Sequence, residues 1–240
     1  MSATIASPDG RPCCRWRAAA PEFLAYHDAE WGFPVDDDRR LFEKLRLEGF
    51  QSGLSWRTIL AKRENFRAAF HGFDFHRIAG FAEADVHRLL KDGGIVRHRG
   101  KSAAVIANAK RAEELVKREG SLAACVWRLE PKPNELAAPQ TASTSAASIA
   151  LSKDLKSRGW SFVGPTTAYA FMQAMGLIND HADECVVREL AAAARAAFTP
   201  SALPQARSNA RRSPAIAAET RRSPHAANAP HNHQGVTTIS

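Results

Sequence analysis

The sequence predicts an all-α domain followed by a basic, low-complexity tail. Apolar residues over 13–185 recur at helical spacing, and no stretch keeps the alternating pattern of a half-buried strand. Of the 240 residues, 45% are hydrophobic and 24% are charged, which is an ordinary globular composition. No apolar run approaches the roughly 18 residues that a membrane span needs. We therefore expect a soluble helical protein with a substantial core.

About eight short helices are predicted, most of them opened by a proline or a capping side chain. Pro21 and Pro165 suit the first turn of a helix, and Asp36–Asp38, Ser55 and Ser121 are good caps. Apolar faces such as Leu41, Phe42 and Leu45 then point to the core. The expected helices cover about 22–31, 38–50, 56–70, 83–91, 101–118, 121–127, 145–159 and 165–176. A polar connection is expected over 131–145.

The two ends differ in composition from the central segment. Residues 1–12 are predicted to be disordered, and they lack the apolar region of a secretory signal, so we expect a cytoplasmic protein. From 186 to 240 the chain holds seven arginines and two glutamates, a formal charge of +5 out of the total of +8. This tail is predicted to be mostly disordered, with a short helix around 186–197. It is either a basic arm that binds phosphates or a segment without a role.

Cysteine and histidine residues at both ends of the domain suggest a metal site. Four cysteines are too few for a disulfide scaffold. His181 and Cys185 are spaced i, i+4, a spacing that on a helix would place them on one face, and Cys14 and His27 lie at the other end. Together they make a Cys2His2 set, typical of structural zinc. The alternative is a histidine beside a buried free thiol, and Cys13 can replace Cys14 as ligand.

Several aromatic residues and one acidic residue suggest a pocket for a flat cationic ring. Glu48 stands in an apolar stretch eight residues before Trp56, while Trp16 and Tyr26 flank the metal-ligand candidates. Aromatic faces stack on such a ring, and a carboxylate accepts hydrogen bonds from its amine. The alternatives are a solvated glutamate and ordinary core packing of the aromatic residues.

Residues 93–101 suggest a turn that contacts phosphate. Gly93 and Gly94 permit close backbone approach, and Gly100 precedes the free N–H groups of the next helix. The charged or titratable residues at this turn are Arg97, His98, Arg99 and Lys101. Such a turn holds DNA by its backbone, although an ordinary charged turn between two helices has the same pattern.

Long motifs resemble one family over about 13–185. They include AYHDAEWGFP at 25–34, LEGFQSGLSW at 47–56, GIVRHRGK at 94–101 and the segment from 143 to His181-x3-Cys185. In this order they resemble the bacterial DNA-3-methyladenine glycosylase I family. The resemblance implies a helix-hairpin-helix DNA-repair fold.

The same resemblance implies an activity and its residues. The activity is hydrolysis of the N-glycosidic bond of 3-methyladenine in double-stranded DNA, with base flipping. Tyr26, Glu48 and Trp56 fall on base-binding positions, and Trp16 lines the pocket. We expect Glu48 to be the catalytic residue, either as a general base or only by binding the base. Residues 94–101 fall on the DNA-contacting hairpin, and Cys14, His27, His181 and Cys185 fall on ligands of one structural zinc ion.

Two further expectations concern chemistry and assembly. No lysine is placed to argue for Schiff-base chemistry, so a monofunctional hydrolase is expected, and one domain suggests a monomer without a membrane partner. The main alternative is a non-enzymatic, zinc-stabilised module that binds damaged DNA. A hydrolase of free modified nucleosides is a second alternative, which the cations of the 93–101 turn disfavour.

Overall fold

Capping side chains in the sequence set the start of most helices. In the computed structural model, which describes residues 2–200, Asp37, Ser55 and Ser121 each accept a hydrogen bond from a backbone N–H three residues later. Eleven α-helices form within the described residues: α1 (Glu22–Ala29), α2 (Asp38–Gln51), α3 (Trp56–Ala61), α4 (Arg63–Ala69), α5 (Phe75–Ala79), α6 (Glu83–Lys91), α7 (Arg99–Glu119), α8 (Leu122–Trp127), α9 (Ala146–Ser157), α10 (Pro165–Ala174) and α11 (Val186–Ala197).

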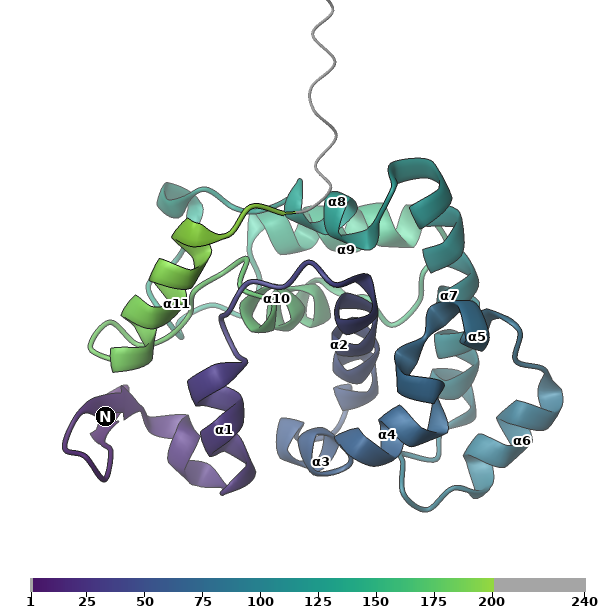
Figure 1. The fold of residues 1–240 in the computed structure, drawn as a ribbon, viewed down its shortest axis with the longest axis horizontal. Helices are drawn as coiled ribbons and strands as arrows, with labels where there is room; N and C mark the ends of the chain where they lie inside the picture. Colours follow the sequence, from purple (N-terminus) through teal and green to yellow (C-terminus); the bar gives the residue numbers. More distant parts are fainter. Residues whose placement is uncertain (1, 201–240) are drawn as a thin grey trace, which may run out of the picture. The chain divides into compact units, whose positions relative to one another are not determined.

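Helix α2 is the centre of the core. Every residue from 41 to 50 on this helix is buried, including the charged ones. The helix packs against α3, α7, α8 and α10, and α10 in turn packs against α9 (Figure 1). Because residues 41–50 are covered on all sides, a polar group among them that has no partner inside the protein destabilises the fold.

Most predicted helices are confirmed, and two differences stand out. The helix expected over 56–70 is two helices, α3 and α4, which meet at Lys62. Helix α5 was not predicted, because its five residues are too few to show a helical period. Short 3-10 turns also form at Arg15–Ala19, His71–Phe73 and Pro133–Glu135.

The N-terminal segment forms a small hairpin, so the prediction of disorder over 1–12 is wrong for the residues that the structure describes. Strand β1 (Thr4–Ala6) pairs antiparallel with β2 (Pro12–Cys14), with Ile5 opposite Cys13. Thr4 Oγ1 also donates to Glu184 at 3.0 Å. Three-residue strands are too short for an alternating pattern, and Glu184 is 180 positions away from Thr4, so local composition does not reveal the hairpin.

The folded domain extends beyond residue 185, where the sequence prediction ended it. The short helix expected at 186–197 forms as α11, with Val187 and Ala191 buried. Arg195 pairs with Glu130, and the ring of Phe198 lies 4.9 Å from that of Trp127. The predicted disorder of 201–240 lies outside the described residues. Among residues 2–200, no helix combines the length and apolar character of a membrane span.

Candidate active site and metal centre

Four ligand-type side chains from both ends of the domain meet in one buried cluster. The ligand atoms of Cys14, His27, His181 and Cys185 all lie within 4.8 Å of one another. His27 Nε2 is 3.2 Å from His181 Nδ1 and 3.6 Å from Cys185 Sγ. His181 Nδ1 is 3.8 Å from each of the two sulfur atoms. The cluster joins the end of β2 and helix α1 to the start of α11.

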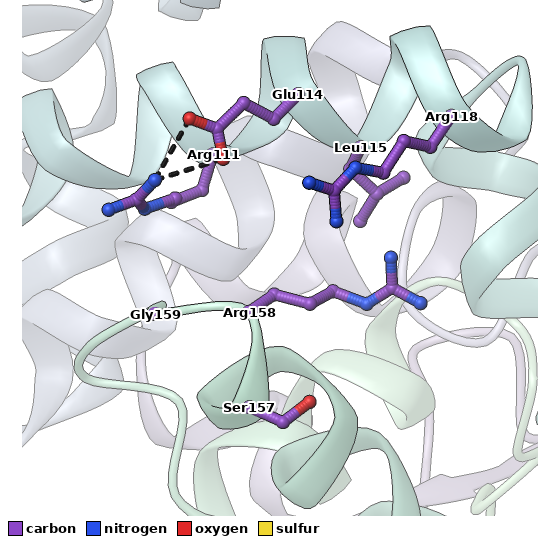
Figure 2. Close-up of a pocket in the computed structure, with 7 residues that line it drawn as sticks. All are labelled: Arg111, Glu114, Leu115, Arg118, Ser157, Arg158 and Gly159. Atoms are coloured by element: carbon purple, nitrogen blue, oxygen red, sulfur yellow. Dashed lines mark hydrogen bonds and ion pairs between the residues drawn. The ribbon is translucent and has the colours of Figure 1, made fainter.

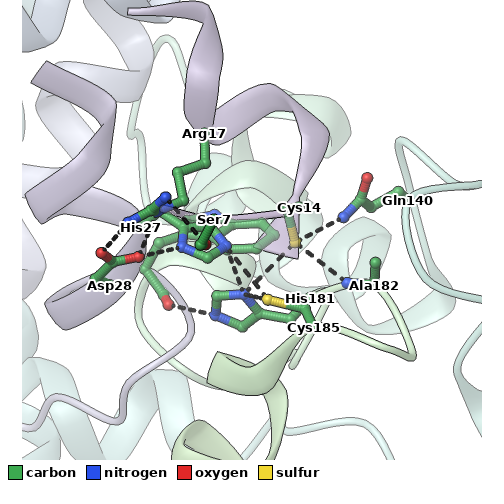
Figure 3. A network of polar contacts seen from close by, with 10 residues as sticks. Ser7, Cys14, Arg17, His27, Asp28, Gln140, His181, Ala182 and Cys185 are labelled. Carbon is green, nitrogen blue, oxygen red and sulfur yellow. Dashed lines mark hydrogen bonds and ion pairs between the residues drawn. The ribbon is translucent and has the colours of Figure 1, made fainter. Parts of the chain in front are cut away.

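Both histidines are oriented by a second partner. His27 Nδ1 lies 2.7 Å from Asp28 Oδ1, and Arg17 donates two hydrogen bonds of 2.7 Å to the Asp28 carboxylate (Figure 3). His181 Nε2 lies 2.9 Å from the carbonyl oxygen of Trp31. Burial lowers the pKa of His181 to about 4. Neutral imidazoles held by an outer carboxylate or carbonyl are the usual form of metal-binding histidines.

The cluster has dimensions that fit zinc. With Zn–S near 2.3 Å and Zn–N near 2.0–2.1 Å, neighbouring ligand atoms of a tetrahedral site are roughly 3.3–3.8 Å apart. The four separations given above are 3.2–3.8 Å. Gln140 Nε2 and the Ala182 N–H donate to Cys14 Sγ at 3.2 and 3.3 Å (Figure 3). The neighbouring Cys13 lies outside the group of four. The geometry therefore favours Cys14 as the ligand.

Trp16 connects the metal cluster to the predicted base pocket. Its half-buried indole meets the His27 ring edge-on at a centroid distance of 5.1 Å and lies 6.4 Å from the Tyr26 ring. Tyr26 in turn lies 5.4 Å from Trp56. Tyr26 and His27 are consecutive residues of α1, so the same helix supplies one residue to each site.

A buried lysine joins the predicted pocket residues to one another. Lys44 Nζ lies 2.7 Å from Glu48 Oε1 and donates to Tyr26 Oη at 2.7 Å. The same nitrogen lies 3.3 Å from the ring centroid of Trp56. Burial lowers the pKa of Lys44, while the Glu48 carboxylate acts in the opposite direction. Burial also raises the pKa of Tyr26, and the Glu48 charge adds to that shift.

Sequence analysis did not include Lys44 among the residues of this site. The signal was present, because Lys44 and Glu48 are spaced i, i+4 in a stretch that is apolar on either side. A lysine in such a helix usually reaches solvent. Only the packing of α3 against α2, together with the bond from Lys44 to Tyr26 of α1, shows that this lysine is enclosed.

The predicted pocket residues line two separate hollows. Tyr26, Trp56 and Lys44 line one of about 30 Å³, which holds little more than one water molecule. Glu48 lines another of about 300 Å³, together with Thr166 and Thr167 of α10. The contact between Lys44 and Glu48 joins a lining residue of the first hollow to a lining residue of the second.

The turn between α6 and α7 is rigidly held. Asp92 Oδ1 accepts from the Gly94 N–H at 2.7 Å. Lys62 Nζ donates to the carbonyls of Gly93 and Gly94 at 3.2 and 3.1 Å. His98 caps α7, since its Nδ1 accepts from the backbone N–H of residue 101 at 3.2 Å. These hydrogen bonds hold the backbone of the turn, which leads in the chain to the exposed Gly100 at the start of α7.

The cations of this turn have different surroundings. Arg97 is exposed and forms no ion pair with any residue from 2 to 200, whereas Arg99 is paired with Glu83. Lys101 is buried, and its Nζ donates to the carbonyls of Phe50 and Ser52 at 2.8 and 2.5 Å. Lys101 therefore closes the end of α2 and does not face solvent as a phosphate contact requires.

Known proteins share this fold and these motifs. The methyladenine glycosylase family model matches residues 16–189. DNA-3-methyladenine glycosylase 1 of Escherichia coli (strain K12) is 47% identical over 176 residues, which cover 72% of this chain and 94% of that protein. The chain belongs to the methyladenine glycosylase family.

Solved structures of the family agree with this assignment. A crystal structure of 3-methyladenine DNA glycosylase I is 47% identical, with a TM-score of 0.68 over 72% of this chain and 98% of that chain. The Staphylococcus aureus enzyme is 34% identical, with a TM-score of 0.69 over 73% and 95%. The predicted family and the predicted class of enzyme, a glycosylase, are confirmed.

A further hollow is separate from the predicted site residues. It has a volume of about 360 Å³ and lies between α7 and the end of α9, lined by Arg111, Arg118 and Arg158 (Figure 2). Arg111 is paired with Glu114, and Arg158 is paired with Glu119 and with Asp154 of its own helix. None of the predicted site residues lines this hollow.

Proposed function

We propose that this glycosylase hydrolyses the N-glycosidic bond of 3-methyladenine in alkylated double-stranded DNA and leaves an abasic site. The observation that carries the proposal is the enclosure of one cation by Tyr26, Trp56 and Glu48. These side chains make a cage suited to positive charge, and methylation at N3 gives adenine such a charge. The names of the relatives, which are 3-methyladenine DNA glycosylases, support the same substrate.

The charge of the substrate defines what the pocket must do. A cationic base leaves as a neutral molecule, so it needs no protonation by the enzyme. In the proposed complex the nucleotide is flipped from the duplex, and a badly paired lesion costs less to extrude. Trp56 and Tyr26 stack on the base, and Glu48 accepts hydrogen bonds from its amine edge.

Binding of the cationic base by Glu48 does not by itself accelerate the reaction. An interaction equally strong in the ground and transition states leaves the rate of the chemical step unchanged. Acceleration must therefore come from positioning of the water or from the field on the sugar as positive charge moves to it. The buried Glu48 carboxylate, with a side chain 5% exposed, supplies such a field.

We assign DNA binding to the turn between α6 and α7, as the hairpin of a helix-hairpin-helix element. Gly94 and Gly100 let the backbone approach a phosphate, the free N–H groups at the start of α7 favour an anion, and Arg97 and Arg99 supply positive charge. His98 acts by capping α7. One such turn in one domain suggests that the protein binds DNA as a monomer.

The metal that we assign to Cys14, His27, His181 and Cys185 is zinc. Four protein ligands leave no open coordination position, so the ion supplies stability and no chemistry at the base. Its role is to hold α1, and with it Tyr26, against the chain that follows α10.

We also propose that the enzyme lacks lyase activity. Schiff-base formation needs an amine with a free lone pair. The Lys44 ammonium donates to Glu48 and Tyr26, and so carries none in this arrangement. Strand cleavage after base release should therefore require added alkali.

The substitution Glu48→Gln tests the proposed function. It should lower 3-methyladenine release from methylated DNA by about tenfold or more, because a charged acceptor becomes neutral. Chromatography of the released bases measures this loss, and thermal melting checks the fold. Glu64→Gln, at a glutamate that is 77% exposed, is the control. Release at the wild-type rate by Glu48→Gln would refute the assigned role.

A further inference from the structure

The buried ammonium of Lys44 occupies the place proposed for the base. Its nitrogen is bonded to Glu48 and Tyr26, and lies 3.3 Å from the Trp56 ring centroid and 4.9 Å from that of Tyr26. The Lys44 side chain is 7% exposed. The three residues assigned to a cationic base are therefore already bound to a cation that belongs to the protein.

The hollow that Lys44 shares with Tyr26 and Trp56 is too small for a purine. The hollow that Tyr26 and Trp56 line has a volume of about 30 Å³, whereas pockets for small molecules start near 300 Å³. A base stacked on Trp56 must take the position of the ammonium. Base and ammonium thus exclude each other.

We propose that Lys44 is a resident counter-ion of the base site, which the flipped base displaces and which returns when the base becomes neutral. This inference rests on the proposed function and adds a specificity-determining residue to it. Lys44 is a positioning residue, since it acts through Glu48 and the two rings.

The exchange selects for charge. A neutral adenine that enters the cage replaces a cation with a group that neither pairs with Glu48 nor gains a cation–π contact. A base methylated at N3 restores both interactions. Neutral bases are therefore rejected even where their shape fits.

The exchange also favours product release. When the bond between the sugar and the base breaks, its electron pair stays with the base, which becomes neutral. A water oxygen then bonds to the positively charged sugar carbon, and the water releases one proton to solvent. The Lys44 ammonium then binds Glu48 better than the product does. Its return empties the site for the next turnover.

The substitution Lys44→Met tests this inference through inhibition by free 3-methyladenine, which is the neutral product. Without the competing ammonium, the inhibition constant in the base-release assay should fall by about tenfold or more relative to wild type. Lys44→Arg keeps the charge and should not lower it. Lys153→Met, at an exposed lysine on α9, is the control and should match wild type. An inhibition constant for Lys44→Met equal to or above that of wild type would overturn the inference.

The wild-type reaction distinguishes a failure of the proposed function from a failure of the role proposed for Lys44. If wild type releases no 3-methyladenine from methylated DNA, the proposed function fails and this inference fails with it. If wild type releases the base but Lys44→Met shows unchanged inhibition, only the role of Lys44 is refuted.

A second measurement needs no variant and so does not depend on the fold of Lys44→Met. In wild-type protein labelled with ¹⁵N-lysine, the ammonium protons held under the Trp56 ring should be shifted by its ring current. Saturation with free 3-methyladenine should move this signal toward that of an exposed lysine. An unchanged signal in the saturated protein would contradict displacement.

Discussion

At the scale of single residues, α2 carries a buried charge without a carboxylate partner. Arg46 is 2% exposed, and its Nη1 donates to the carbonyl of Ser161 at 3.2 Å. Its Nε and Nη2 have no hydrogen-bond partner among the described residues. The guanidinium lies 5.1 Å from the Trp160 ring centroid and 5.7 Å from that of Phe42. Burial lowers the pKa of Arg46 to about 9, which means that the folded state disfavours its charge.

Replacing Arg46 by methionine should therefore stabilise the protein. An apolar side chain of similar length removes the uncompensated charge, and we expect a gain of about 1 kcal/mol or more, or roughly 2–4 °C in Tm. Because the folded pKa is lower than the unfolded one, the gain should be full below pH 9 and shrink above it. Thermal melting at pH 7 and pH 10 measures this. Arg39→Met, at an exposed arginine of the same helix, should change Tm little, and a lower Tm for Arg46→Met would contradict the argument.

At the scale of elements, the end of α10 depends on one glycine. Gly176 follows the helix with φ +79°, as predicted for a residue that closes it. A Cβ at this position would lie 2.5 Å from backbone atoms of Phe33 and Pro34. The close contact between these two backbone segments precedes His181 by five residues, so it helps to place that ligand.

Gly176→Ala should lower the stability by about 2 kcal/mol or more, or roughly 4–8 °C in Tm. An alanine held in the left-handed backbone conformation accounts for about 1 kcal/mol of this loss, and displacement of the Phe33–Pro34 backbone accounts for the rest. Gly53→Ala is a matched control, because Gly53 has the same φ of +79° and no atom within 4 Å of the added Cβ. Differential scanning calorimetry compares the two variants. Equal losses would show that the backbone contact is unimportant.

At the scale of the whole folded domain, the cluster of Cys14, His27, His181 and Cys185 joins segments that are more than 150 residues apart. The pair His27–His181 and the pair Cys14–His181 span 154 and 167 positions. Trp31 lies between the cluster and the core, with its indole 4.7 Å from the His181 ring. A metal ion that binds only the folded cluster stabilises the whole domain by mass action.

Removal of the proposed zinc ion should therefore lower Tm, because the ion stabilises the fold and takes no part in the chemistry of base release. At free zinc about 100-fold above its Kd, the loss on chelation is about 3 kcal/mol, or roughly 6–12 °C. Cys14→Ser should lose the zinc that elemental analysis detects, whereas Cys13→Ser should keep one ion per chain. Chelation that abolishes base release and leaves Tm unchanged would count against a structural ion, and loss of zinc in Cys13→Ser would assign the ligand to the other thiol.

Much of the fold was predictable because its signals are local. Ser55 and Ser121 predicted the starts of α3 and α8, and the Ala-rich stretch from 186 predicted α11. The N-terminal hairpin was not predictable, because its three-residue strands carry no period and its contact with Glu184 joins distant segments. For the same reason the end of the domain was placed too early.

The sequence by itself determined the helical class, the family motifs and the chemical types of the site residues, since each depends on spacing and identity along the chain. Tertiary structure alone decided which groups are enclosed together. It showed that Cys14, and not Cys13, belongs to the ligand cluster. It showed that Lys101 donates to carbonyls at the end of α2 and does not face solvent. It also placed Lys44 in contact with Tyr26, Trp56 and Glu48. The physical reason is that the environment of a charged side chain is set by neighbours from other helices, and no local pattern records those neighbours.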